Sequence, residues 1–278
     1  MTDETQSKFN ITLPTAPSLL GEITACGDDI NKAGDVIAKD PQLADEVLNV
    51  INAPYFQLVR KINSVSEAGR MLGLTRIFNL TTGRLLKSEV FNSDDKGIPE
   101  IWKSSLKIAV LCVLISKKTG LAAADEAYTV ALFHNAGMAL VANQVSGYWK
   151  LVKAAYLREA SNISQLEEEK LGNSHAKLGA ELATAWGLTP AISQTIALHH
   201  SPESINKQLG KKNDISDLLV TLKIAEYIAK LPSYITRGPE NFEWAVIEQS
   251  CLDYLELTEG MFKRFEHNIK TTLSEMKF

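Results

Sequence analysis

Apolar residues recur at helical spacing along almost the whole chain. After the pair Asp40-Pro41, the residues Leu43, Val47 and Ile51 follow one another at intervals of four, which places them on one face of a helix. Aspartate is favoured as a helix cap and proline as the first helical residue, so Asp40-Pro41 marks where this helix begins. No β-type alternation of useful length occurs, and the pattern therefore predicts an all-α fold.

The same spacing divides the chain into two groups of helices. Gly73 and Gly120 each follow a predicted helix and suit its C-terminal end. Residues 91–99 are rich in Asn, Ser, Asp, Gly and Pro, which favours a hinge. The polar stretch 201–214 is expected to be a loop. Helices are predicted at residues 65–72, 75–90, 100–119, 125–142, 148–160, 174–186, 190–199, 215–230 and 259–275.

Two lobes are therefore expected within one domain that spans residues 13–278. The N-terminal helical lobe covers residues 13–92, and the second lobe, a helical bundle with the C-terminal helices, covers residues 98–278. The polar residues 1–12 ahead of them are expected to form a flexible N-terminus. A chain of 278 residues is long enough to bury a core in this arrangement.

Composition narrows the class of protein. The chain is 45% hydrophobic and 22% charged, with a formal net charge of -4, so it has no strong positive field that would attract nucleic acid or an anionic membrane. Its most apolar stretch, residues 108–115, is much shorter than the roughly 20 residues that a membrane span needs. Cys26, Cys112 and Cys251 lie far apart and are typical of buried, reduced thiols. We expect a cytoplasmic protein without a nucleic-acid or membrane partner.

Four of the five histidines fall on three predicted helices of the second lobe. They are His134, His175 and the pair His199-His200, whereas His267 stands apart and is expected at the surface. Histidines from different helices of a bundle can converge on a metal ion, especially when carboxylates join them. The alternative is that each of these histidines only caps a helix or packs in the core.

Other polar features predict structural roles. The run Glu167-Glu168-Glu169-Lys170 is expected to form a charged, solvent-facing side of a helix. The pair Ser104-Ser105 lacks the Gly-x-Ser-x-Gly context of a nucleophilic serine. The four tryptophans are spread among helices and predict core packing. None of these features predicts a catalytic residue.

Several short segments between residues 13 and 202 follow one another in a specific order and spacing. Together they resemble the HDOD domain, a non-catalytic relative of the HD-superfamily metal-dependent phosphohydrolases. The segments are Leu-Pro-Thr-Ala-Pro at 13–17, Val-Ile-Ala-Lys-Asp-Pro-Gln-Leu at 36–43, Leu-Asn-Val-Ile-Asn-Ala-Pro-Tyr-Phe at 48–56, Ile-Asn-Ser-Val-Ser-Glu-Ala at 62–68, Leu-Phe-His-Asn-Ala-Gly at 132–137, His-Ala-Lys-Leu-Gly-Ala at 175–180 and His-His at 199–200.

The resemblance implies an HD-like second lobe whose metal site is degenerate. An active HD enzyme uses an upstream histidine, a His-Asp pair and a distant aspartate. This chain offers Ser104 or Ser105 at the first position, His134-Asn135 at the second and Glu226 at the third. Asparagine presents one neutral carbonyl oxygen, whereas aspartate presents two charged oxygens that can bridge two cations. The resemblance thus implies weakened metal binding.

Three functions stay open. The first is a bacterial signal-transduction module that needs no cofactor, has no catalytic residue and binds a regulatory partner protein in trans. The second is a metal-dependent phosphohydrolase acting on a nucleotide or a phosphomonoester. The third is a sensor that binds a small ligand, such as a nucleotide, in the former active-site cleft. A single divalent metal ion, if bound, would take its ligands from His134, His175, His199, His200 and Glu226.

Overall fold

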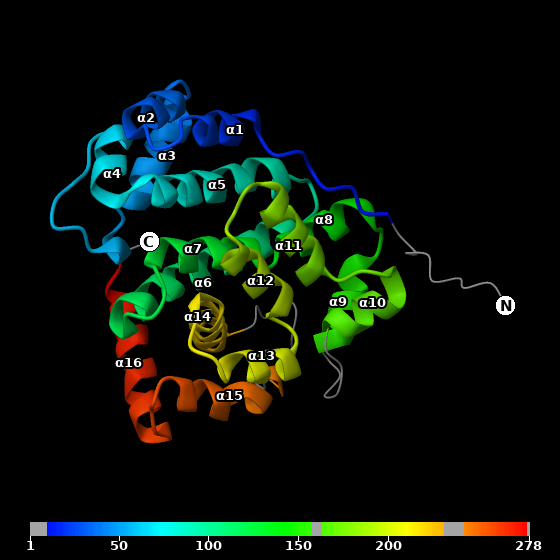
Figure 1. The fold of residues 1–278 in the computed structure, drawn as a ribbon. Helices are drawn as coiled ribbons and strands as arrows, with labels where there is room; N and C mark the ends of the chain where they lie inside the picture. The colour runs from blue at the N-terminus through cyan, green and yellow to red at the C-terminus, as the bar shows by residue number, and fades with distance from the viewer. Residues whose placement is uncertain (1–9, 157–162, 231–241, 277–278) are drawn as a thin grey trace.

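The computed structural model describes residues 10–156, 163–230 and 242–276, and within them all regular structure is helical (Figure 1). This confirms the predicted all-α fold. The first lobe contains α1 (Ser18–Ala25), α2 (Ile30–Ala38), α3 (Pro41–Ile51), the short 3-10 helix η1 (Pro54–Phe56), α4 (Val65–Leu72) and α5 (Leu74–Val90).

The second lobe begins with α6 and contains the remaining helices. They are α6 (Ile98–Thr119), α7 (Ala124–Phe133), α8 (Ala136–Gln144), α9 (Tyr148–Tyr156), α10 (Ile163–Leu171), α11 (His175–Ala185), α12 (Pro190–Leu198), α13 (Pro202–Leu209), α14 (Asp214–Ala229), α15 (Phe242–Tyr254) and α16 (Glu259–Glu275). Among the described residues, no helix combines the length and the apolar character that crossing a bilayer requires.

Helix boundaries follow the local signals in the sequence. The side chain of Asp40 accepts a hydrogen bond from the backbone N–H of Leu43 at 3.0 Å, which caps α3 at its start. Gly73 and Gly120 follow α4 and α6 with φ angles of 89° and 72°, a region that glycine enters without steric cost. These boundaries confirm the predicted ends of both helices.

The lobes meet along α5, which packs against α7 (Figure 1). Within the first lobe α2 packs on α4 and α3 packs on α5, while α6, α7 and α14 form the centre of the second lobe. The apolar stretch 108–115 predicted as a core helix is buried throughout its length in α6. The core therefore runs through both lobes, and α7 lies at its middle.

The segment between α5 and α6 is tied to the second lobe. Asp95 accepts a hydrogen bond from the Trp149 indole N–H at 2.8 Å and another from the backbone N–H of Gly97 at 2.7 Å. A Cβ atom on Gly97 would lie 2.4 Å from the Trp149 ring, so the close approach requires glycine. The segment expected to be a hinge between the lobes is thus held against α9 by the contacts of Asp95 and Gly97 with Trp149.

Two sequence predictions about helices were wrong. The single helix expected at residues 125–142 is two helices, α7 and α8, because the chain turns at His134-Asn135. Next to this break the backbone of His175 approaches so closely that a Cβ atom on Gly137 would lie 2.0 Å from its carbonyl oxygen. The loop expected at 201–214 contains α13. Most of its residues are polar, which hid the helix, but Ile205 and Leu209 lie buried on one face.

Two predictions reach outside the described residues. The helix expected at 148–160 is present as α9 up to Tyr156, and its last positions lie beyond the described range. The expected flexible N-terminus at residues 1–12 is described only from residue 10 onward.

Candidate functional site

Four histidines gather where three helices of the second lobe end or begin. His134 follows α7, His175 begins α11, and His199 and His200 follow α12. Their ring centroids are 5.4 Å apart for His134 and His199, 5.4 Å for His175 and His199, and 4.1 Å for His199 and His200. All four side chains are buried, while His267 is exposed as expected.

Backbone carbonyl oxygens orient two of the four rings. The Nδ1 atoms of His134 and His199 lie 2.6 Å from the carbonyl oxygens of Ala131 and Ile196, respectively. Each of these nitrogens must therefore carry the proton and donate it, since a carbonyl oxygen only accepts. The second nitrogen, Nε2, then keeps its lone pair, which is the arrangement that a metal-binding histidine needs.

Glu167 orients the third ring, and the sequence prediction for it was wrong. Glu167 does not face solvent: its side chain is 0% exposed, and it accepts hydrogen bonds from His175 through Nδ1 at 2.7 Å and the backbone N–H at 2.9 Å. The Tyr148 hydroxyl donates to its other oxygen. Burial alone would raise the pKa of Glu167, but His175 and Tyr148 outweigh it and lower the pKa.

Glu243 orients the fourth ring and also holds a buried lysine. Its Oε2 lies 2.8 Å from Nδ1 of His200, and its Oε1 accepts a hydrogen bond from Nζ of Lys223 at 2.7 Å. Burial would raise the pKa of Glu243, yet Lys223 and His200 outweigh it and bring the pKa to about 2. Sequence reasoning missed Glu243, which lies 43 residues from His200 in the chain.

Lys223 supplies a permanent positive charge beside the histidines. Its Nζ lies 2.5 Å from Oε2 of Glu226 and donates to the carbonyl oxygen of His199 at 2.9 Å, in addition to Glu243. Burial would lower the pKa of Lys223, but the two carboxylates outweigh it and raise the pKa. The sequence carried a signal for this residue, because Lys223 interrupts an otherwise apolar stretch of α14.

Asn135 forms a hydrogen bond with the lone pair on Nε2 of His134. Its side-chain N–H donates to Nε2 of His134 at 2.8 Å. The carboxylate of Glu226 lies 3.5 Å from the same nitrogen. Burial lowers the pKa of His134 to about 4, against the opposing effect of Glu226, so the imidazole is neutral near pH 7.

The residues expected to bind metal therefore divide into two sets. His175, His199 and His200 each offer a ligand atom, and these atoms lie within 4.8 Å of one another. Three imidazoles with oriented rings suit a single transition-metal ion such as zinc. These residues fit one ion, and they would hold it from the ends of α11 and α12.

The second set does not fit the two-metal centre of an HD enzyme. Asn135 is neutral and bonded to His134, and Glu226 is paired with Lys223. Of the two serines, Ser104 is partly exposed, whereas Ser105 is buried with a hydroxyl that has no hydrogen-bond partner among the described residues. Neither a bridging carboxylate nor an upstream histidine is present at these positions.

Fold and site define a class of all-helical proteins in which buried histidines gather at the ends of three helices. The sequence model of the HDOD domain matches residues 13–202, and the chain therefore belongs to the HDOD family. Among curated proteins, an uncharacterised protein of Treponema pallidum is 27% identical over 201 residues, which is 68% of this chain and 38% of that protein. The chain thus spans less than two fifths of that relative's length.

Solved structures share the fold. A proposed signal transduction protein from Marinobacter aquaeolei has a TM-score of 0.64 at 19% identity, covering 93% of this chain and 57% of that one. A proposed phosphohydrolase from Shewanella amazonensis has a TM-score of 0.58 at 19% identity, covering 88% and 94%. An HDOD domain protein from Geobacter sulfurreducens has a TM-score of 0.55 at 20% identity, covering 88% and 92%. At these identities the similarity shows the fold alone.

Proposed function

We propose that this chain is a regulatory module of signal transduction that acts by binding a partner protein in trans, with no hydrolysis at the former HD metal site. The observation that carries the proposal is the position of Lys223, whose ammonium group pairs with Glu226 and Glu243 inside the protein. A positive charge built into the chain thereby pairs with Glu226, the carboxylate at the position where an HD hydrolase would offer one to its metals.

Electrostatics opposes a second cation at this place. Two unit charges about 4 Å apart interact by roughly 4 kcal/mol at an effective dielectric constant near 20. A divalent ion beside Glu226 would have to overcome this repulsion from Lys223 or displace its ammonium group from two ion pairs. Asn135 adds no charge in compensation. The repulsion from Lys223 and the neutral side chain of Asn135 both support a protein that binds a partner without hydrolysing a substrate.

The partner is expected to be a protein of a signalling system. The structural neighbour from Marinobacter aquaeolei, named as a signal transduction protein, supports this class. Affinity capture followed by reconstitution from purified components tests this part. A stoichiometric complex with a signalling protein would support the proposal, and a reconstituted complex only with enzymes of unrelated metabolism would contradict it.

Metal analysis and a phosphatase screen test the absence of hydrolysis. Purified protein is assayed with Mn, Mg, Fe and Ni against nucleotides and phosphomonoesters, beside His134→Ala and the exposed control His267→Ala. We expect all three proteins to turn over substrate at the same background rate. Turnover that disappears in His134→Ala and persists in His267→Ala would establish a hydrolase instead.

A single structural ion is the second candidate, and it would lie at His175, His199 and His200. The three ligand atoms within 4.8 Å favour it. Glu167 and Glu243 bind Nδ1 of His175 and His200, which turns the other nitrogen of each ring toward an ion. The positive charge of Lys223 nearby opposes it. Elemental analysis with a zinc titration decides, because one bound equivalent that is lost in His199→Ala and kept in His267→Ala would establish the ion.

A nucleotide sensor at the same place is the third candidate. The four imidazoles are buried, so a nucleotide could reach them only after local opening. A ligand that binds only the folded state raises the unfolding temperature. Thermal-shift screening with nucleotides tests this candidate, and an absence of any shift at high ligand concentration would remove its support.

A further inference from the structure

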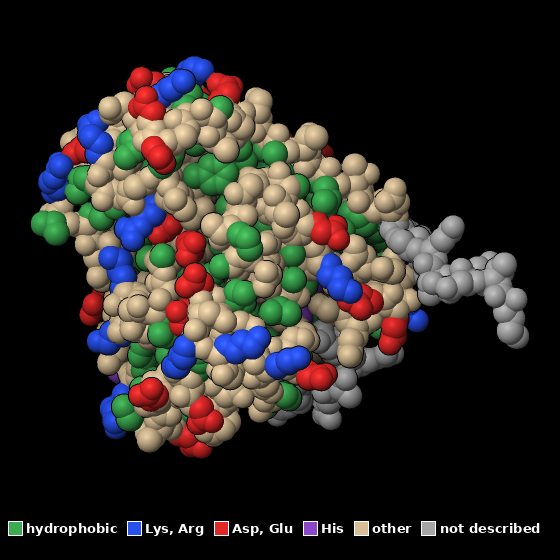
Figure 2. Space-filling view, viewed as in Figure 1, with side chains coloured by type: hydrophobic (Ala, Val, Ile, Leu, Met, Phe, Trp, Pro, Cys, Tyr) green, Lys and Arg blue, Asp and Glu red, His purple; other side chains and the backbone are tan. Residues whose placement is uncertain are grey.

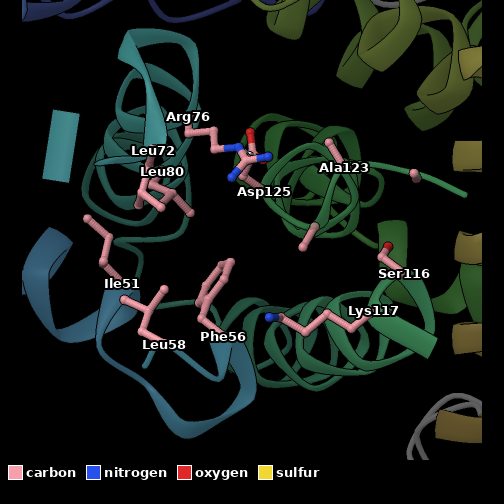
Figure 3. Close-up of a pocket in the computed structure, with 12 residues that line it drawn as sticks. Ile51, Phe56, Leu58, Leu72, Arg76, Leu80, Ser116, Lys117, Ala123 and Asp125 are labelled. Carbon is pink, nitrogen blue, oxygen red and sulfur yellow. Dashed lines mark ion pairs between the residues drawn. The ribbon is translucent and has the colours of Figure 1, made fainter. Parts of the chain in front are cut away.

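A cavity of about 260 Å³ lies between the two lobes, away from the histidines (Figure 3). Residues of α3, η1, α4 and α5 line it on the side of the first lobe, and residues of α6, α7 and their connection line it on the other. It adjoins the start of α7, whereas His134 follows the end of that helix. At about 1.5 Å per residue, the ten residues of α7 separate the two places by roughly 15 Å.

The first lobe gives this cavity an apolar wall. Ile51, Phe56, Leu58, Leu72 and Leu80 contribute their side chains to it, and Figure 3 shows them on one side of the opening. Short alanine side chains at residues 122–124 leave room on the opposite side. Such a surface favours an apolar body on the ligand, because burial of apolar surface stabilises the complex.

The charged residues of the lining leave one positive charge uncompensated. The guanidinium of Arg76 pairs with the buried carboxylate of Asp125 at 3.1 Å, and Asn79 donates to the other oxygen of that carboxylate. Lys117 extends from α6 across the opening toward Phe56 (Figure 3), and no carboxylate of the described residues lies within ion-pair distance of its Nζ. Two cations and one anion therefore line the cavity.

A buried hydroxyl is a further polar group without a partner. Ser116 lines the cavity, is 2% exposed, and its Oγ has no hydrogen-bond partner among the described residues. A buried hydroxyl normally finds a partner, because leaving it unpaired costs roughly 1–3 kcal/mol. A ligand with a polar group would satisfy it.

We propose that this cavity binds a small amphipathic carboxylic acid, whose carboxylate pairs with Lys117 and whose apolar body lies against Phe56, Leu72 and Leu80. A single negative charge matches the single uncompensated lysine, whereas a doubly charged phosphate would exceed it. The occupant contacts both lobes. The site is separate from the histidine cluster, so it stands or falls independently of the proposed regulatory function.

The test uses three probes that differ only in their polar group: 3-phenylpropanoate, 3-phenylpropanol and 3-phenylpropylamine. Binding to the full chain is followed by NMR chemical-shift perturbation. We expect the acid to bind more tightly than the alcohol and the amine to bind least, with perturbations centred on the lining residues. Equal affinity of the three probes, no binding at millimolar concentration, or perturbations elsewhere would overturn the proposal.

Variants at two adjacent lysines make the test specific. Lys117→Met should weaken binding of the acid by about three- to fivefold, as expected for a partly exposed ion pair. Lys117→Glu should reverse the preference from the acid to the amine. Lys118→Met, which alters an exposed lysine outside the lining, should leave the preference unchanged.

Exposed apolar side chains near the opening indicate what else could bind here, namely a segment of another protein. Val59 and Met71 are exposed next to the lining residues Leu58 and Leu72, and Arg60 lies 3.5 Å from the sulfur of Met71. A protein segment that combines an acidic with a large apolar residue would have the same chemistry on a larger scale. If such a peptide perturbs the lining residues while 3-phenylpropanoate does not, the small-acid proposal is overturned in favour of a protein partner.

Discussion

The two ends of α7 show opposite ways of managing polar groups between packed helices. At its C-terminal end, three glutamates, Glu167, Glu226 and Glu243, already have partners in His175, His200 and Lys223. At its N-terminal end, the side chains leave a cavity, and Lys117 extends across it without an anionic partner (Figure 3). The first region satisfies its own charges, and the second leaves one for a ligand.

The difference teaches where function is to be sought in this chain. Perturbed pKa values and clustered histidines normally mark an active site. Here they coincide with a closed charge network, in which Lys223 is already paired with Glu226 and Glu243. The space-filling view agrees, because hardly any histidine surface is visible on the face that Figure 2 presents. The cavity shows smaller pKa shifts, but it has open volume and a lysine, unpaired among the described residues, with which a ligand can interact.

The largest expected effect comes from removing the central cation. Lys223→Met should lower the free energy of unfolding by about 3–5 kcal/mol, because it leaves the partly buried carboxylates of Glu226 and Glu243 without their counter-charge. Urea denaturation at pH 7 measures the change. Adding Glu226→Gln should recover part of the loss. A loss below about 1 kcal/mol would mean that solvent reaches the network, which contradicts the closed description.

The pH dependence of stability tests the same region with a smaller effect. Burial lowers the pKa of His134 to about 4, below the value near 6.5 of an exposed histidine. As pH falls through 6.5, His134 takes up a proton in the unfolded chain but stays neutral in the folded chain. The free energy of unfolding should therefore decrease by up to about 3 kcal/mol between pH 6.5 and pH 4.

The variant His134→Gln isolates this contribution. Urea denaturation of metal-free protein at several pH values should show a shallower decline for the variant than for the wild type. His199, whose pKa burial also lowers, contributes a decline in both proteins. Identical slopes in the two proteins would show that the pKa of His134 is the same in the folded and the unfolded chain.

Neutralising Glu167 should have an intermediate effect. Glu167→Gln keeps the shape but weakens the hydrogen bonds to His175 and Tyr148, so we expect a loss of about 1–3 kcal/mol. Glu168→Gln is the matched control, since this neighbouring carboxylate is exposed and should change stability by less than about 0.5 kcal/mol. Equal effects in the two variants would mean that Glu167 faces solvent, as the sequence pattern predicted.

The smallest effect on stability is expected at the cavity. Lys117→Met should change the free energy of unfolding by no more than about 0.5 kcal/mol, because Lys117 is exposed and has no ion pair to lose among the described residues. Thermal denaturation without ligand measures it. A large loss would show that Lys117 supports the fold, and the contrast between the two ends of α7 would disappear.

The sequence by itself determined most of the helices and the family. Capping and terminating residues such as Asp40, Gly73 and Gly120 act within one or two turns, so their effect could be predicted without the fold. The order of the family segments gave the HDOD domain, and the substitution at Asn135 was visible from the pattern. These signals are local, or they are fixed by spacing along the chain.

Tertiary structure decided which charges are buried and which are paired. The glutamate run at residues 167–170 looked solvent-facing because composition does not reveal a neighbour, and His175 lies against Glu167 only after α10 and α11 pack. Glu243 and Lys223 meet the histidines across long stretches of chain for the same reason. The cavity beside Lys117 arises between the lobes. Each of these depends on contacts between helices distant in sequence, which helical spacing alone does not encode.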